Sequence, residues 1–210
     1  MKEQLTRQSC QAFSEQLASK APVPGGGGAA ALIGALAAAL GSMAANLSLG
    51  KKNLLLYEED HRRIIRETEA LRLRFLDLTE EDAEAFEPLS RAYSLDRNAP
   101  DYADVMTAAT LGAAQAPFAM MRRCCELIEL LEELRGKCSA LLLSDVGCAA
   151  AAGRAALECA AMNVFVNTRL LPENGKTREL AEKAEAMLRD YLPRAQALVN
   201  SVTDFLREPK

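Results

Sequence analysis

The spacing of apolar residues predicts helices along almost the whole chain. Apolar side chains recur three or four residues apart, as in Leu71, Phe75 and Leu78, which places them on one face of a helix. We find no alternating Val, Ile or Thr run and no Asn-Gly or Asp-Gly hairpin turn between apolar segments. The sequence therefore predicts an all-α protein of about six helices, at residues 2–19, 29–48, 54–95, 102–134, 139–170 and 177–206.

Prolines and glycines mark where the predicted helices end or bend. A loop at 22–28 separates the first two helices, and a turn at 172–175 precedes the last one. Pro88 predicts a bend in the third helix, and Pro117 predicts an interruption in the fourth. Together the six helices make a single-domain bundle that spans residues 1–210.

Several apolar residues are expected to face the interior of this bundle. The first helix would turn Leu5, Phe13 and Leu17 inward, and the last would do the same with a stripe that ends in Val202 and Phe205.

Two helices, at 29–48 and 139–170, are crowded with Ala and Gly. Such small residues let neighbouring backbones approach closely, so we expect these helices to form a central pair. Between Asp145 and Arg169 the second of them carries just two charges, Arg154 and Glu158, which lie on one face because they are four residues apart. We therefore expect a second subunit to complete part of its surface, giving a homodimer.

The composition excludes some classes of partner and site. Half of the residues are hydrophobic, the formal net charge is −4, and no basic patch of the kind that binds nucleic acid is present. The six cysteines form no C-x-x-C pair, so we interpret them as reduced core residues of a cytoplasmic protein with no zinc site. The polar start of the chain has no secretory signal.

One uncharged segment, 29–49, is about as long as a membrane-crossing helix. It is built mainly on Ala, Gly and Ser, and the charged residues Lys51 and Lys52 follow it. We therefore favour a helix buried inside the protein over a membrane helix.

Four consecutive glycines, Gly25, Gly26, Gly27 and Gly28, follow Pro24 and lead into the Ala-rich helix. A run of this kind is kept where a side chain would not fit or where the backbone needs unusual freedom. The N–H groups and positive dipole end of a helix start suit a carboxylate or phosphate, whereas the alternative is a tight turn that lets two helices pack. Neither a P-loop nor a Rossmann motif fits, since no strand precedes the glycines.

Charged residues near the middle of the chain allow two interpretations each. Lys51 and Lys52, which follow Gly50, are typical of a solvated helix end but could also hold an anionic group. His61, the one histidine, lies in a run of mixed charge that indicates a solvated helix face, and so a catalytic role is disfavoured.

Two aspartates and two asparagines are the remaining candidates for chemistry. Asp82 lies on a helix whose inner side carries Phe86, so it is a candidate acid or base. Asp145, which follows Ser144, is a second candidate, although Ser-Asp before an apolar run more often caps a helix. Asn163 and Asn167 lie one helical turn apart in an apolar stretch. If they are buried, these polar side chains need hydrogen-bond partners from other helices or from a ligand.

Three segments in this order resemble the cyclodeaminase/cyclohydrolase family: APVPGGGGAAALIGALAAALGSMAANLSLGKK, DAEAF and SDVGCAAAAGRAALECAAMNVFVN. The resemblance covers nearly the whole chain, although the family usually has Ser where this chain has Gly28. It implies a helical homodimer that acts on a reduced folate, and nothing in the sequence indicates a metal or redox cofactor. Lys51, Lys52 and the glycine amides would then hold the anionic glutamate tail, and Asp82 or Asp145 would face the pterin edge or the cationic one-carbon bridge.

The resemblance implies two possible reactions. A cyclohydrolase adds water to 5,10-methenyltetrahydrofolate and produces 10-formyltetrahydrofolate, whereas a cyclodeaminase closes 5-formimidoyltetrahydrofolate and releases ammonia. The absence of a formimidoyltransferase domain from this sequence favours the cyclohydrolase. A catalytically silent helical dimer that serves as an interaction module is the third alternative.

Overall fold

The computed structural model describes residues 4–169 and 175–208, and within them it contains helices and no strand. This confirms the all-α prediction. The six α-helices are α1 (Cys10–Leu17), α2 (Gly26–Ser48), α3 (Glu58–Ala92), α4 (Tyr102–Arg135), α5 (Leu143–Arg169) and α6 (Gly175–Arg207). Three short 3₁₀ helices are η1 (Leu5–Arg7), η2 (Lys52–Tyr57) and η3 (Ala140–Leu142).

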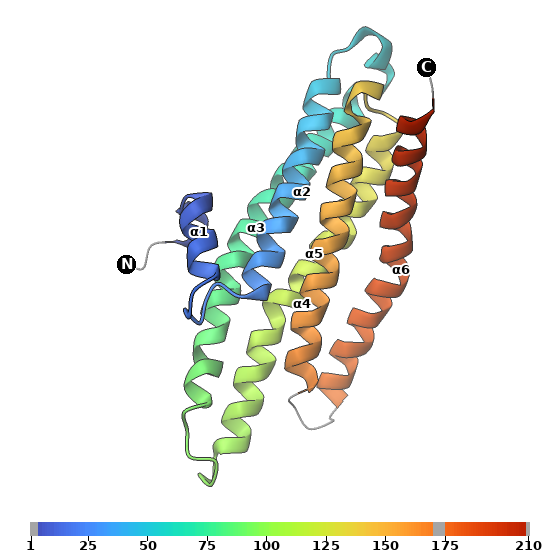
Figure 1. Ribbon diagram of the computed structural model, residues 1–210. Coiled ribbons are helices and arrows are strands. Elements are labelled where there is room, and N and C mark those ends of the chain that lie inside the picture. Colours follow the sequence, from blue (N-terminus) through green and yellow to red (C-terminus); the bar gives the residue numbers. More distant parts are fainter. Residues whose placement is uncertain (1–3, 170–174, 209–210) are drawn as a thin grey trace.

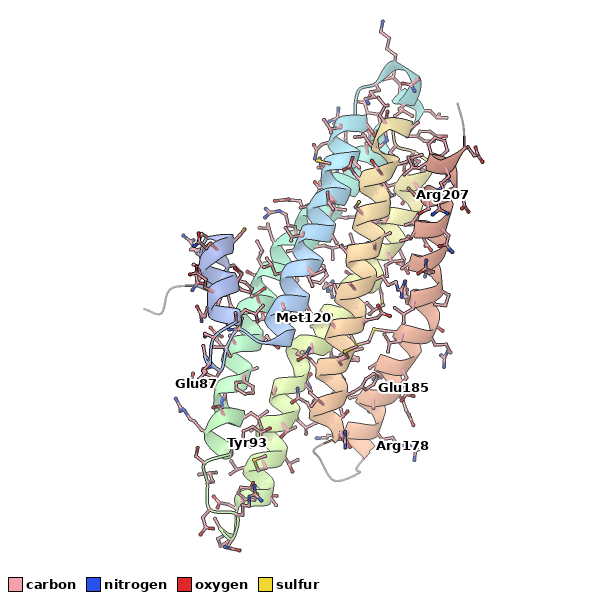
Figure 2. All side chains as sticks on the ribbon, in the orientation of Figure 1. Glu87, Tyr93, Met120, Arg178, Glu185 and Arg207 are labelled. Atoms are coloured by element: carbon pink, nitrogen blue, oxygen red, sulfur yellow. The ribbon has the colours of Figure 1, made fainter. Side chains whose placement is uncertain are left out.

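The five long helices, α2 to α6, lie side by side in an elongated bundle (Figure 1). Helix α2 packs against α3 and α5, and α5 also packs against α4 and α6. The short helix α1 lies outside the bundle beside α3, and α2 begins part-way along α3 rather than at its end (Figure 1). Below that start, Glu87 on the lower part of α3 and Tyr93, the C-cap residue that follows the helix, have exposed side chains (Figure 2).

The small residues of α2 allow its neighbours to approach closely, as their pattern predicts. A Cβ atom added at Gly34 would lie 2.7 Å from the ring of Phe75 on α3, and one added at Gly41 would lie 2.9 Å from Leu131 on α4. Atoms of these side chains occupy the space that a larger residue would need. The glycines of α2 therefore fix how near α3 and α4 can come.

In the first half of the chain the helix boundaries differ from the prediction in three places. The first predicted helix is divided, because the Ser9 hydroxyl accepts a hydrogen bond from the N–H of Ala12 and so starts a separate helix, α1. Helix α2 begins at Gly26, so three of the four glycines form its first turn instead of a loop. The third predicted helix is divided into η2 and α3.

One proline does not interrupt its helix as predicted. Helix α4 continues through Pro117, which is buried against the neighbouring helices. Helix α3 also continues through Pro88, where the sequence predicts a bend. The turn predicted at 172–175 falls almost entirely outside the described residues.

Two of the predicted inward residues are exposed instead. Leu5, Phe13 and Val202 are buried, whereas Leu17 is 39% exposed and Phe205 is 40% exposed. Both exceptions lie in the last turn of a helix, or next to it, where fewer neighbouring helices cover the chain.

His61 is buried, so the prediction of a solvated face at this position is wrong. Its side chain is fully covered, and its Nε2 atom lies 2.7 Å from the carbonyl oxygen of Lys137. Neighbouring charges of α3 do face solvent and pair with Lys137, whose ammonium binds Asp60 at 2.7 Å. Near its start, α3 therefore packs one face against the end of α4, while its opposite face is exposed to solvent.

The cysteines are all free, and their burial varies. Cys124 and Cys125 are buried in the core, whereas Cys10 and Cys148 are exposed. The expectation that they are core residues therefore holds for part of the set.

The outer side of α2 and α5 remains apolar and uncovered in the single chain. We call this surface the α2/α5 face, and five of its large side chains are between 39% and 67% exposed: Leu36, Met43, Leu47, Met162 and Val166. Two helical segments, Gly26–Ser48 and Ala140–Arg169, are long and apolar enough to cross a membrane, which core helices of a bundle can also be.

Candidate active site

A cavity of about 160 Å³ lies where α2 begins. Four helices and the loop before α2 contribute to its wall, so it joins segments that are far apart in the sequence. The residues that line it are Pro22, Val23, Gly25, Gly26, Gly27, Asp82, Phe86, Ala113, Asn163, Val166 and Asn167.

The glycines differ in what they contribute to this cavity. Gly25 is the N-cap of α2, and a Cβ added there would meet no atom within 4 Å. Gly26 and Gly27 lie in the first turn, where backbone N–H groups have no acceptor within the helix. Gly28 is buried, and a Cβ added to it would lie 3.2 Å from Pro24, so this pair packs beneath the cavity instead of lining it.

The carboxylate of Asp82 lies directly against Gly27. A Cβ atom added at Gly27 would lie 2.2 Å from Oδ1 of Asp82 and 2.5 Å from Oδ2, which no real contact tolerates. Glycine at position 27 is therefore required for the carboxylate of α3 to reach the first turn of α2. This close approach explains why glycine, which has no side chain, occupies the start of the most apolar helix.

Burial changes the acidity of this carboxylate. Desolvation raises the pKa of Asp82 from 3.8 to about 6, and the backbone N–H of Gly28 acts in the opposite direction by favouring the charged form. At neutral pH the group is mainly ionised but is a stronger base than an exposed aspartate. Such a pKa suits a group that accepts and returns a proton near pH 7.

The two asparagines of α5 bring free acceptors to the cavity. The amide of Asn163 donates to the carbonyl of Cys159 at 2.8 Å, and that of Asn167 donates to the carbonyl of Asn163 at the same distance. Both bonds lie within α5, so the asparagines do not link helices through them. In the described part of the chain no donor pairs with their side-chain oxygens, which are left for a ligand.

The loop before α2 is held by the N-terminal segment. Gln16 of α1 donates a hydrogen bond to the carbonyl of Val23 at 2.9 Å. Glu80 of α3 accepts hydrogen bonds from the backbone of Leu5 and Thr6, at 3.2 and 2.9 Å, which attaches η1 to the bundle. These bonds fix one wall of the cavity.

The other candidate residues lie at the opposite end of α2. Its 23 residues rise by about 1.5 Å each, so Lys51 and Lys52 lie roughly 34 Å from the glycines. Asp145 lies in the first turn of α5, next to Ser144, and the hydrogen bond from the Ser139 N–H to Ser48 joins that end of α5 to the end of α2. Within one chain, the structure therefore separates the candidates into two groups.

Sequence reasoning did not place five residues of the cavity wall in the site: Pro22, Val23, Phe86, Ala113 and Val166. Val23, Ala113 and Val166 are small or apolar, and nothing in their local sequence distinguishes them from core residues. Among the described residues, no group of three His, Cys, Asp or Glu side chains is arranged to hold a metal ion.

Comparison with known proteins places this geometry in a family. The family model described as formiminotransferase-cyclodeaminase matches residues 9–186. The chain belongs to this family. The match includes every residue of the cavity and both groups of candidate residues.

Individual members of the family differ in their named activities. The methenyltetrahydrofolate cyclohydrolase of Methylorubrum extorquens is 36% identical over 86% of this chain and 89% of its own length. The formimidoyltransferase-cyclodeaminase of Rattus norvegicus is 27% identical over 92% of this chain, which spans 37% of that longer protein. The crystal structure of formiminotetrahydrofolate cyclodeaminase from Thermotoga maritima superposes with a TM-score of 0.82 at 28% identity, covering 94% of this chain and 98% of that one.

Replacement of Gly27 by Ala tests the contact with Asp82. We expect G27A to lower the free energy of unfolding by about 1–3 kcal/mol, because the new methyl group displaces the carboxylate. The same substitution made in a D82A background should cost little, since the clashing group is gone. Urea denaturation of the double-mutant cycle measures this coupling. G153A serves as the control, because a Cβ there meets Leu127 at an ordinary 3.6 Å.

The raised pKa of Asp82 predicts a pH-dependent stability. The folded protein holds the proton on Asp82 up to about pH 6, whereas the unfolded chain releases it near 3.8, so the stability from this group falls as pH rises from about 4 to 6. We expect D82N to be more stable than wild type by about 2 kcal/mol at pH 7.5 and no more stable at pH 3.5. Urea denaturation at both values measures this, and the exposed Asp77, changed to Asn, should show no such difference.

Proposed function

We propose that this chain hydrolyses 5,10-methenyltetrahydrofolate to 10-formyltetrahydrofolate. The observation that carries the proposal is the half-buried carboxylate of Asp82, which lies against bare backbone in a cavity at a helix start. The Methylorubrum relative supports it, because that protein is named for this reaction and is matched over 89% of its length.

In the proposed reaction the ionised Asp82 faces the positively charged bridge carbon of the substrate. Water adds to this carbon and gives one proton to Asp82, which later releases it to solvent. The hydroxyl adduct then collapses: its remaining proton moves to N5 as the bond between the carbon and N5 breaks, and the formyl group stays on N10. The N–H groups at the start of α2 stabilise negative charge on the adduct oxygen or on the ligand.

The cyclodeaminase reaction is the second candidate. It is supported by the Thermotoga structure, which has the same fold over 94% of this chain and is named for that activity. In this reaction N10 attacks the formimidoyl carbon and ammonia leaves, so a carboxylate near the carbon again moves a proton. The third candidate, a catalytically silent interaction module, would not require a buried carboxylate at Asp82.

The proposal includes a homodimer in which each site draws on both chains. The α2/α5 face is apolar and uncovered, and an isologous pair would bury it against its own copy. If the two copies of α2 run antiparallel, Lys51, Lys52, Ser144 and Asp145 of one subunit come beside Asp82 of the other. The lysines would then bind the glutamate tail of the folate.

The remaining parts of the proposal concern partners and location. The steps above use a carboxylate, backbone amides and water, so the proposed enzyme needs no metal or redox cofactor. We propose a cytoplasmic enzyme that binds neither nucleic acid nor membrane, because its net charge is −4 and its most apolar helix, α2, is mainly buried inside the bundle.

Turnover of the two folates tests the proposed reaction. Wild-type protein mixed with 5,10-methenyltetrahydrofolate should cause its near-ultraviolet absorbance to disappear, and the same band should fail to form from 5-formimidoyltetrahydrofolate. D82N and D145N should each lower the rate at least about tenfold with helicity unchanged in circular dichroism. Formation of the band from the second folate would identify a cyclodeaminase. Turnover of neither folate by the wild type would indicate the silent module.

Complementation between two variants tests the shared site. D82N and D145N chains, coexpressed with different tags, should form mixed dimers in which one of the two sites carries neither substitution. If Asp82 and Asp145 of each site come from different subunits, the mixture should recover about a quarter of wild-type activity, since half of the dimers are mixed. A mixture no more active than its parents would show that each site is built by one chain.

A further inference from the structure

Pro117 leaves one backbone acceptor of α4 without its helical donor. The residue lies inside α4 and is buried, and proline has no N–H to donate to the carbonyl four residues earlier, which belongs to Ala113. Among the described residues, no side chain donates a hydrogen bond to this oxygen either. Because Ala113 is 6% exposed, the oxygen has little access to bulk water. A buried acceptor in this state is costly unless something binds it.

Ala113 is also the residue through which α4 reaches the cavity of Asp82. One turn earlier on the same face, the hydroxyl of Thr110 is completely buried and has no hydrogen-bond partner. The face of α4 that packs beside the cavity therefore carries one hydroxyl without a partner and one carbonyl that lacks the usual helical donor four residues later. Unsatisfied groups in a folded protein call for a ligand or an ordered water.

The chemistry of the cavity wall is unusual for its excess of acceptors. The carboxylate of Asp82 and the free oxygens of Asn163 and Asn167 are acceptors, and Ala113 lines the same wall, whereas the donors are the backbone amides at the start of α2 and the second N–H of each asparagine amide. This balance matches a ligand edge rich in N–H groups, which the aminopyrimidine edge of a pterin provides. At about 160 Å³ the cavity is smaller than a site for a whole drug-sized ligand, so it fits one ring system.

Resting on the proposed function, we propose that the carbonyl oxygen of Ala113 accepts a hydrogen bond from an N–H group of the pterin ring. Pro117 is then a positioning residue: it does not touch the folate, but it keeps this oxygen free. An N–H at position 117 would compete with the substrate for the same acceptor.

A Pro117→Ala variant tests this, because alanine supplies the missing N–H. Pro193, inside α6, provides the matched control: it leaves the carbonyl of Arg189 without a donor in the same way, but both residues are exposed and outside the cavity. We expect both P117A and P193A to melt at or above the wild-type temperature, since proline in a helix interior is unfavourable.

The two variants should differ in folate binding. P117A should raise KM for 5,10-methenyltetrahydrofolate about tenfold with kcat within about threefold of wild type, because one hydrogen bond in a bound complex is worth about that factor. With 5-formyltetrahydrofolate as a non-reacting probe, the rise in melting temperature should be smaller for P117A than for wild type. P193A should match wild type in both measurements.

Three results would overturn the inference. If wild type turns over the folate and P117A has unchanged KM and an unchanged response to 5-formyltetrahydrofolate, the carbonyl does not bind the substrate, and the proposed function stands. If P117A raises KM but melts well below wild type, Pro117 has a structural role. If wild type turns over neither folate and does not respond to the probe, the proposed function and this inference fail together.

Discussion

The contact between Gly27 and Asp82 is the constraint on which the site depends. Because position 27 has no Cβ, the first turn of α2 can lie against a carboxylate of α3 and helps to bury it. Exclusion of water raises the pKa of Asp82 to about 6. A single missing methyl group thus determines both the packing of two helices and the acidity of the group between them. The N-terminal segment, through Gln16 and Val23, holds the loop that brings the glycines there.

The sequence predicted the helices and one half of the site because both depend on local patterns. Apolar spacing identifies a helix without knowledge of its neighbours, and four glycines before an apolar run indicate a close contact whatever its partner. Burial at single positions depends on tertiary packing instead. His61 lies in a charged run, yet the turn after α4 places a carbonyl next to it and covers it completely. The start of α2 at Gly26 likewise follows from the contact with Asp82 and not from helix propensity, which is poor for glycine.

The grouping of the candidate residues could not be obtained from the sequence either. The family resemblance groups Lys51 and the glycines around one folate, with Asp82 or Asp145 at its pterin. A straight helix of 23 residues holds its two ends about 34 Å apart, and this length alone divides the candidates. The uncovered α2/α5 face runs between the two groups. If two chains pair through the α2/α5 face, one group of candidate residues from each chain comes next to the other group of its partner.

The site also explains why one fold can carry two named activities. Both reactions pass through a tetrahedral carbon held between N5 and N10, and both need a group that takes and returns a proton near neutral pH. A carboxyl group with a pKa near 6 can do so in either direction, so Asp82 does not select between them. The difference lies in the nucleophile, which is water in one reaction and N10 of the folate in the other. In the proposed site, selection must therefore come from the walls that orient the pterin and admit or exclude water, and the side-chain oxygens of Asn163 and Asn167 belong to those walls.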